Sequence, residues 1–237
     1  MRLHRLKTLR VGVALVFFTL TGVVFLDFHN LVAPSIAGGL LYPQFVPSLL
    51  QYLSAPTLAA SGFIGVVVLT LLFGRVYCST LCPLGTLQDV IGFVARRKRR
   101  RRGFRYCEPH TVLRYGILAL TVLLLLSGSG LLLNLLVPFS NFGRITTNLF
   151  RPMVLFVNNL AAATFEQWGV YTLSRVRWAV FSPLSVAVSL ATLLLVAWLA
   201  VSRGRLYCNT VCPVGTLLGL FAGISWLRIG INHENCK

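Results

Sequence analysis

Acidic residues are scarce in this chain. Five Asp and Glu stand against 22 Lys and Arg among 237 residues, and all charged types together make up 11%. Soluble domains carry roughly 25% charged residues, so this share does not suit a water-soluble surface. The carboxylates are scattered rather than paired: Asp27, Asp89, Glu108, Glu166 and Glu234. No acid–base or nucleophilic constellation is therefore predicted, and an enzyme with its own substrate pocket is not expected.

Histidine is also rare, and its placement excludes two functional classes. The four histidines lie at or beyond the ends of the apolar runs described below: His4, His29, His110 and His233. A b-type cytochrome needs axial histidines inside its helical bundle, so no haem is expected. Ion-coupled transporters carry ionisable residues near the middle of the membrane, and these runs have none there.

Long apolar runs are what the sequence has in abundance, and 56% of its residues are hydrophobic. Four runs, at about 9–28, 57–74, 112–137 and 181–202, reach the roughly 20 residues that cross a bilayer as a helix. The sequence predicts an all-α integral membrane protein with four transmembrane helices. An alternative makes the first run a cleaved signal peptide, with Ser35-Ile36-Ala37 as its cleavage site, and leaves the remaining topology unchanged.

The positive charges fall mostly on one side of such a bundle. With the N-terminus inside, 18 of the 22 Lys and Arg lie in the cytoplasm, including the basic run 96–102. This bias predicts a bacterial cytoplasmic (inner) membrane location with both termini in the cytoplasm. The basic run is expected near anionic lipid headgroups. No aromatic interleaving accompanies it, so nucleic acid is not an expected partner.

A duplication is the strongest signal in the chain. Segment 74–87 recurs as 204–217, and 10 of the 14 positions are identical. The halves 1–103 and 104–237 are therefore predicted to be two parallel two-helix repeats, each ending in a Cys-x-x-x-Cys-Pro motif near the cytoplasmic face. The second half has the longer external loop. Its apolar stretch 148–163 is expected in the lipid–water interface on the external side of the membrane.

The repeated motif has a helical spacing and a built-in interruption. A separation of four places both cysteines of a motif on one helical face. Pro83 and Pro213 remove an amide donor, so a regular helix through either motif is not expected. Apolar residues recur at helical spacing beyond each proline, which predicts short amphipathic helices along the cytoplasmic membrane surface.

Four motif cysteines are the candidate ligands: Cys78, Cys82, Cys208 and Cys212. In a reducing cytoplasm this pattern favours metal or redox chemistry over disulfides. One motif supplies two thiolates and two motifs supply four, so the motifs are expected to converge around one iron–sulfur cluster, with zinc as the alternative metal. Regulatory thiol chemistry, or cysteines merely inherited by duplication at helix ends, are the other interpretations.

Two cysteines stand outside the motifs. Cys107 is interpreted as a plain small residue. Cys236, next to the last residue, is predicted to be a metal ligand that begins a ferredoxin-like run not present in this sequence.

The pattern Gly-Arg-x-Tyr-Cys-x-x-x-Cys-Pro-x-Gly-Thr-Leu, present twice, resembles the NapH/NosR-type membrane polyferredoxins and related oxidase accessory proteins. The resemblance implies a following domain with two four-iron clusters that starts at a cysteine placed like Cys236. This sequence stops at Lys237 and is expected to be a fragment.

The resemblance also implies electron transfer from the quinone pool or cytoplasmic donors to a respiratory reductase with ferredoxin-like or periplasmic partners. No residue is assigned to a quinone. The alternative is an assembly or anchoring protein for a metalloenzyme complex.

Overall fold

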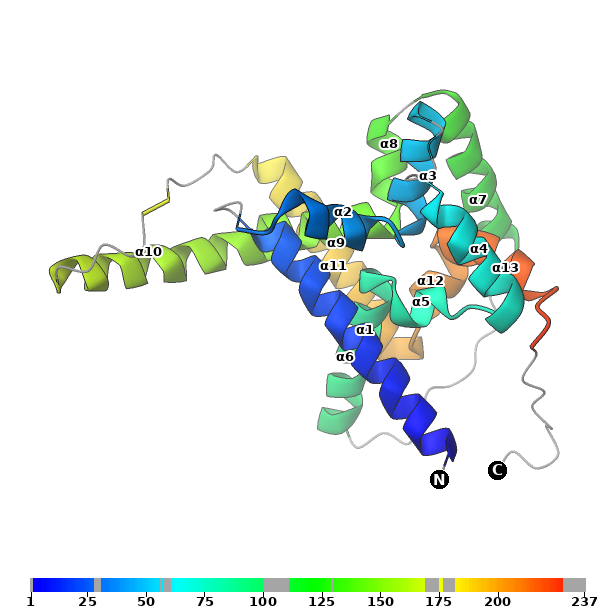
Figure 1. Ribbon diagram of the computed structural model, residues 1–237, viewed down its shortest axis with the longest axis horizontal. Helices are drawn as coiled ribbons and strands as arrows, with labels where there is room; N and C mark the ends of the chain where they lie inside the picture. The colour runs from blue at the N-terminus through cyan, green and yellow to red at the C-terminus, as the bar shows by residue number, and fades with distance from the viewer. Residues whose placement is uncertain are drawn as a thin grey trace.

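The computed structural model describes residues 2–27, 31–55, 57, 61–99, 111–128, 130–168, 175–176 and 182–227. Over these residues the chain forms helices and turns without a strand, which confirms the all-α prediction (Figure 1). The helices, in chain order, are α1 (Arg2–Leu26), α2 (Pro34–Leu41), α3 (Phe45–Ser54), α4 (Gly62–Phe73), α5 (Tyr77–Thr80), α6 (Pro83–Arg99), α7 (Thr111–Leu126), α8 (Gly130–Leu136), α9 (Pro138–Ile145), the π-helical turn η2 (Thr146–Phe150), α10 (Arg151–Gln167), α11 (Pro183–Arg203), α12 (Leu206–Thr210) and α13 (Pro213–Ala222).

Two helices in the described part of the chain are long and apolar enough to cross a membrane. They are Lys7–Leu26 within α1 and Pro183–Ser202 within α11, each 20 residues long. The other two expected spans are shorter helices, 12 residues in α4 and 16 in α7. Four full-length spans are thus not established, and a membrane location is allowed by α1 and α11.

The third apolar run is divided, whereas the sequence predicted one helix over 112–137. Helix α7 ends at Leu126, and α8 begins at Gly130 after a turn at Ser127 and Gly128. Gly128 has a φ of +70°, in the left-handed region that favours glycine and ends helices. Continuous hydrophobicity did not reveal this break, because both helices are apolar.

The helices that follow the two motifs each pack against helices of both halves. Helix α6 packs against α1 of its own half and α11 of the other, while α13 packs against α7 of its own half and α4 of the other. Both helices are partly buried in the protein: Leu84, in the first turn of α6, and Leu218, in the second turn of α13, have no exposed surface, and the expected position along the membrane surface stays a prediction. Apolar side chains are exposed farther along both helices, such as Val94 of α6 and Leu220 of α13.

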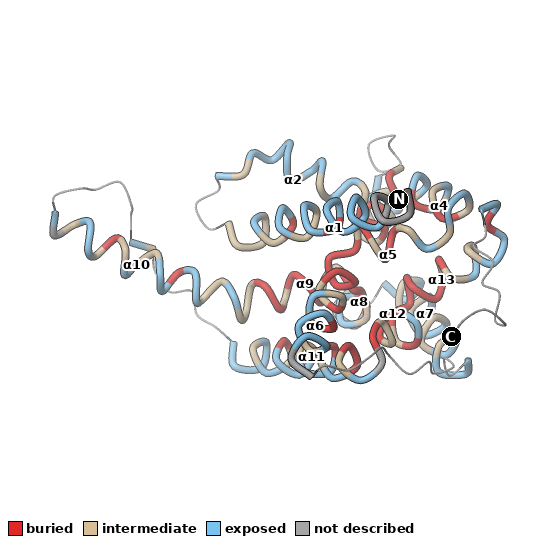
Figure 2. The backbone as a smooth tube through the Cα atoms, turned by 90° about the horizontal axis from the view of Figure 1, so that it is seen from below, coloured by how far each residue is buried: buried red, intermediate tan, exposed pale blue. Residues whose placement is uncertain are grey.

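Burial is concentrated where these elements meet. Figure 2 shows buried segments gathered around α5, α6, α9, α12 and α13, with α1 and α11 mostly exposed along their outer faces. Those outer faces carry large apolar side chains, including Val16, Leu20, Leu194 and Trp198. Large contiguous apolar surface of this kind marks contact with a membrane or another protein.

The long connection of the second half is helical over residues 138–167. The stretch 148–163, expected in the outer interface, belongs to η2 and α10, and α10 projects away from the other helices in Figure 1. Its exposed residues include Met153, Phe156 and Val157.

Candidate functional site

Each cysteine motif starts at a glycine that ends the preceding helix. Gly74 closes α4 with a φ of +76°, and Gly204 closes α11 with a φ of +75°. Side chains other than glycine avoid this left-handed conformation, so both positions of the repeat require glycine. The turn directs the chain from the long helix into the short helix that carries the first cysteine.

The motif itself is a short helix, a turn and a new helix. Cys78 lies in α5 and Cys208 in α12, whereas Cys82 and Cys212 come just after these helices and just before the prolines that open α6 and α13. The prediction of an interrupted helix is confirmed. The amide of Cys82 donates to the Tyr77 carbonyl at 3.0 Å, five residues back, so the turn is wider than an α-helical one.

The second cysteine of each motif lies at the start of the following helix. The Gly215 amide donates to the Cys212 sulfur at 3.4 Å. Amides of Gly85 and Leu84 likewise lower the pKa of Cys82, although burial raises it more. Free amides at a helix N-terminus favour negative charge, so here they offset part of the effect of burial on the thiolate.

A close approach explains the glycine after each proline. A Cβ atom on Gly85 would lie 2.3 Å from the Cys78 carbonyl oxygen, and one on Gly215 would lie 2.1 Å from that of Cys208. The first turns of α6 and α13 therefore pack directly on the backbone of the first cysteine. Gly85 and Gly215 make it possible for both cysteines of a motif to share one tightly folded unit.

Buried amide side chains hold the motif tyrosines. The Tyr77 hydroxyl donates to Gln44 Oε1 and accepts from the Phe45 amide, both at 3.1 Å. The Tyr207 hydroxyl accepts from Asn141 Nδ2 at 3.1 Å. Gln44 and Asn141 were not among the residues predicted from the sequence. Each is followed by a phenylalanine, a weak repeat that the sequence does carry.

Two arginines connect the motifs. Arg205 Nε donates to Asp89 Oδ1 at 2.7 Å and a second guanidinium nitrogen contacts Oδ2, joining the second motif to α6. Arg75 donates to Asn209 Oδ1 at 2.8 Å, joining the first motif to α12. One arginine of the second half contacts the first half, and one arginine of the first half contacts the second. Together these contacts hold the two motifs side by side.

All four motif cysteines are free and buried in this region. Burial raises the pKa of Cys208 to about 12, and the Cys82 thiolate adds repulsion. Burial also raises the pKa of Cys212, with further repulsion from Cys208, Cys82 and Cys78. Thiols of the two motifs therefore oppose one another's ionisation.

Among the residues that the structure describes, no three His, Cys, Asp or Glu side chains are gathered tightly enough to hold one metal ion. A four-iron cluster is larger than an ion and carries its thiolates at separate corners. Four buried thiols with helix-start amides and two nearby arginines fit the donor set and charge of such a cluster. The residues present therefore suit a cluster held by both motifs.

Several predicted residues fall outside the described part of the chain. They include Cys107, Cys236, His29, His110, His233 and the end of the basic run 96–102.

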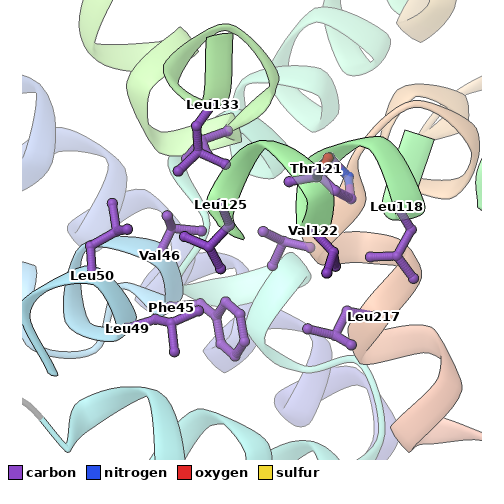
Figure 3. A pocket seen from close by; sticks show the side chains of 13 residues that line it. Phe45, Val46, Leu49, Leu50, Leu118, Thr121, Val122, Leu125, Leu133 and Leu217 are labelled. Atoms are coloured by element: carbon purple, nitrogen blue, oxygen red, sulfur yellow. The ribbon is translucent and has the colours of Figure 1, made fainter. Parts of the chain in front are cut away.

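Two cavities lie beside the motifs. One, of about 90 Å³, is lined by apolar side chains of α3, α7, α8 and α13, with Thr121 among them, and reaches Pro213 beside Cys212 (Figure 3). The other, of about 320 Å³, is polar; its lining residues are Arg10, Gln88, Asp89, Gly92, Arg96, Gly204 and Arg205.

Comparison with known proteins shows what the two motif-containing segments are similar to. The family described as "4Fe-4S binding domain" matches residues 55–102 and 184–232, so each match contains one motif. The chain is 27% identical over 175 residues to the "Putative electron transport protein YccM" of Escherichia coli (strain K12). The alignment covers 72% of this chain and 40% of that relative. No solved structure matches the chain. These similarities support an iron–sulfur protein of ferredoxin type.

Proposed function

We propose that this protein is a membrane-embedded electron-transfer component of the NapH/NosR type, with one four-iron cluster held by Cys78, Cys82, Cys208 and Cys212. The observation that carries the proposal is the meeting of two 4Fe-4S-like segments through reciprocal contacts between their motifs. Such a cluster accepts and releases one electron at a time. The chain's own residues keep the thiols buried, present amides to them and place Arg75 and Arg205 nearby.

The membrane part of the proposal rests on two apolar helices and on charge. α1 and α11 supply apolar lengths suited to a bilayer. With the shorter runs 57–74 and 112–137 also crossing, as the proposal requires, Lys and Arg divide 18 to 4 and favour cytoplasmic motifs. Phe18 of α1 also packs against Phe142 with ring centroids 5.4 Å apart. This contact supports α1 as a part of the folded protein over a cleaved signal peptide.

The positions of the two cavities and the relative's name support the electron partners that we propose. A donor or acceptor in the cytoplasm would approach the polar cavity beside Arg205, whereas a quinone would approach from the lipid, where the apolar cavity reaches Pro213. We propose a respiratory reductase complex as the destination of the electrons, with ferredoxin-like or periplasmic partners.

Iron and acid-labile sulfide analysis of the purified full chain tests the cluster. We expect about four of each per chain, with a paramagnetic signal after reduction. Cys78→Ser and Cys208→Ser should each abolish most of the iron, and the double variant should lose no more than either single one, because all four thiols act as a unit.

Cys107→Ser serves as the matched control, since that cysteine is not predicted to be a ligand, and it should retain the iron. Iron-free wild-type protein with a normal fold would instead favour the alternative, an assembly or anchoring protein. Independent, additive losses from the two motifs would contradict a shared cluster.

A further inference from the structure

In the part of the chain that the structure describes, the side-chain amide of Gln88 contacts the sulfur of a motif cysteine. It lies on α6, is 1% exposed and donates from Nε2 to the Cys208 sulfur at 3.1 Å. A longer contact of 3.4 Å links the same nitrogen to the Leu84 carbonyl. The residue belongs to the first half of the chain, while the sulfur belongs to the second. Because a metal-bound thiolate only accepts hydrogen bonds, the amide nitrogen is the end that faces it.

The second half does not provide the equivalent donor. The offset of 130 that relates the motifs places Leu218 where the first half has Gln88. Leu218 is as deeply buried, with an exposed fraction of 0%, but its side chain has no hydrogen to donate. Cys78, the counterpart of Cys208, thus cannot receive this bond from α13. The two motifs are alike in sequence and different in what surrounds their first cysteine.

Gln88 also carries an unfavourable feature that a simple packing role would not require. Its Oε1 is buried without a hydrogen-bond partner among the described residues. An unsatisfied buried oxygen is destabilising, and a leucine, as at position 218, fills the same depth without that loss. The glutamine is therefore best explained by what its N–H group does at Cys208.

We propose that Gln88 is a positioning residue that raises the reduction potential of the cluster, by donating an amide hydrogen bond to the Cys208 sulfur. Adding an electron makes the cluster and its thiolates more negative, and a hydrogen bond to sulfur favours that more negative state. The inference rests on the proposed four-thiolate cluster. It adds that the two halves contribute unequally to the potential, with α6 of the first half acting on the motif of the second.

The test is a redox titration of the full chain, followed by the paramagnetic signal of the reduced cluster. Gln88→Met removes the donor at nearly constant volume, and Gln88→Leu copies the second repeat. Both should keep their iron and sulfide and shift the one-electron equilibrium about tenfold toward the oxidised form, a lowering of about 59 mV. Thr70→Val is the matched control, because Thr70 is equally buried but donates to the Val66 carbonyl, and its potential should not change.

Each outcome decides a different point. Loaded Gln88 variants with the wild-type potential would overturn the role of Gln88 and leave the cluster in place. Loss of iron from both variants, with Thr70→Val still loaded, would show that Gln88 is required to hold the cluster. That result would overturn the proposal that Gln88 sets the reduction potential. A wild-type chain that binds no iron would overturn the cluster and the inference together.

Discussion

The single hydrogen atom that serves as the side chain of Gly85 faces the carbonyl oxygen of Cys78, and Gly215 repeats this contact with Cys208. Neither glycine has a positive φ, so space rather than backbone conformation dictates the residue type. In both motifs the helix after the proline can approach the first cysteine only because no Cβ intervenes. The distance between the two cysteines of a motif therefore depends on a residue that has no side chain.

Gly85→Ala and Gly215→Ala should each destabilise the protein by about 1–3 kcal/mol, since a backbone oxygen cannot move aside as a flexible side chain can. The measurement is the midpoint of thermal unfolding in detergent, together with iron content. Gly65→Ala, in α4 with open space around its Cβ position, is the matched control and should be neutral or slightly stabilising. Equal midpoints for Gly85→Ala and Gly65→Ala would contradict the close contact.

Tyr77→Phe should cost about 1–3 kcal/mol in unfolding free energy, because Gln44 and the Phe45 amide would lose their buried partner. Tyr42→Phe provides the comparison: Tyr42 is 45% exposed and its hydroxyl contacts Ser61 at the surface, so water replaces the lost bond. Denaturant unfolding of the two variants separates them. A loss as large for Tyr42→Phe would show that hydroxyl removal alone, not burial, causes the effect.

At the scale of helices, the sequence predicted features that depend on neighbouring residues, but not which distant helices pack together. Pro83 and Pro213 act within one turn, and the predicted interruptions and following helices are present. The packing of α6 on α11 depends on tertiary contacts across more than 100 residues, so hydrophobic periodicity indicated an apolar face but not what would cover it. For the same reason the sequence identified the motif cysteines but not Gln44, Asn141 or Gln88.

The break between α7 and α8 gives a prediction at this scale. Gly128→Ala should destabilise the protein by about 1–2 kcal/mol, because alanine disfavours the left-handed backbone conformation. The added Cβ would meet open space, so crowding would not contribute. Gly116→Ala, within α7 and equally uncrowded, should be neutral or stabilising. Thermal unfolding compares the two. A neutral Gly128→Ala would favour the single helix over 112–137 that the sequence predicted.

For the whole molecule, the direction of insertion decides which compartment the site serves. The native motif thiols cannot report it, because each is at most 8% exposed and would resist labelling from either side. Introduced cysteines can, in a background with Cys107→Ser and Cys236→Ser. Val94→Cys, on the exposed end of α6, should react with a membrane-impermeant maleimide only after permeabilisation.

Thr164→Cys, on exposed α10, is the reciprocal position and should react in intact cells. Both positions are on helices, so differences in local order are small. Labelling of Val94→Cys from outside would reverse the topology and place the site on the external face.

The exchange of α6 and α13 between the halves bears on the protein's ancestry. Each half packs its post-motif helix against the helix that precedes the motif of the other half, and an arginine of each motif contacts a residue of the opposite half. A single-repeat ancestor could have made these contacts only with a second copy of itself, so the pseudo-twofold axis would once have been that of a homodimer. Two repeats joined in one chain allow positions 88 and 218 to differ, which a symmetric homodimer does not permit. Glutamine at position 88 and leucine at position 218 are a difference that a homodimer of identical chains cannot have.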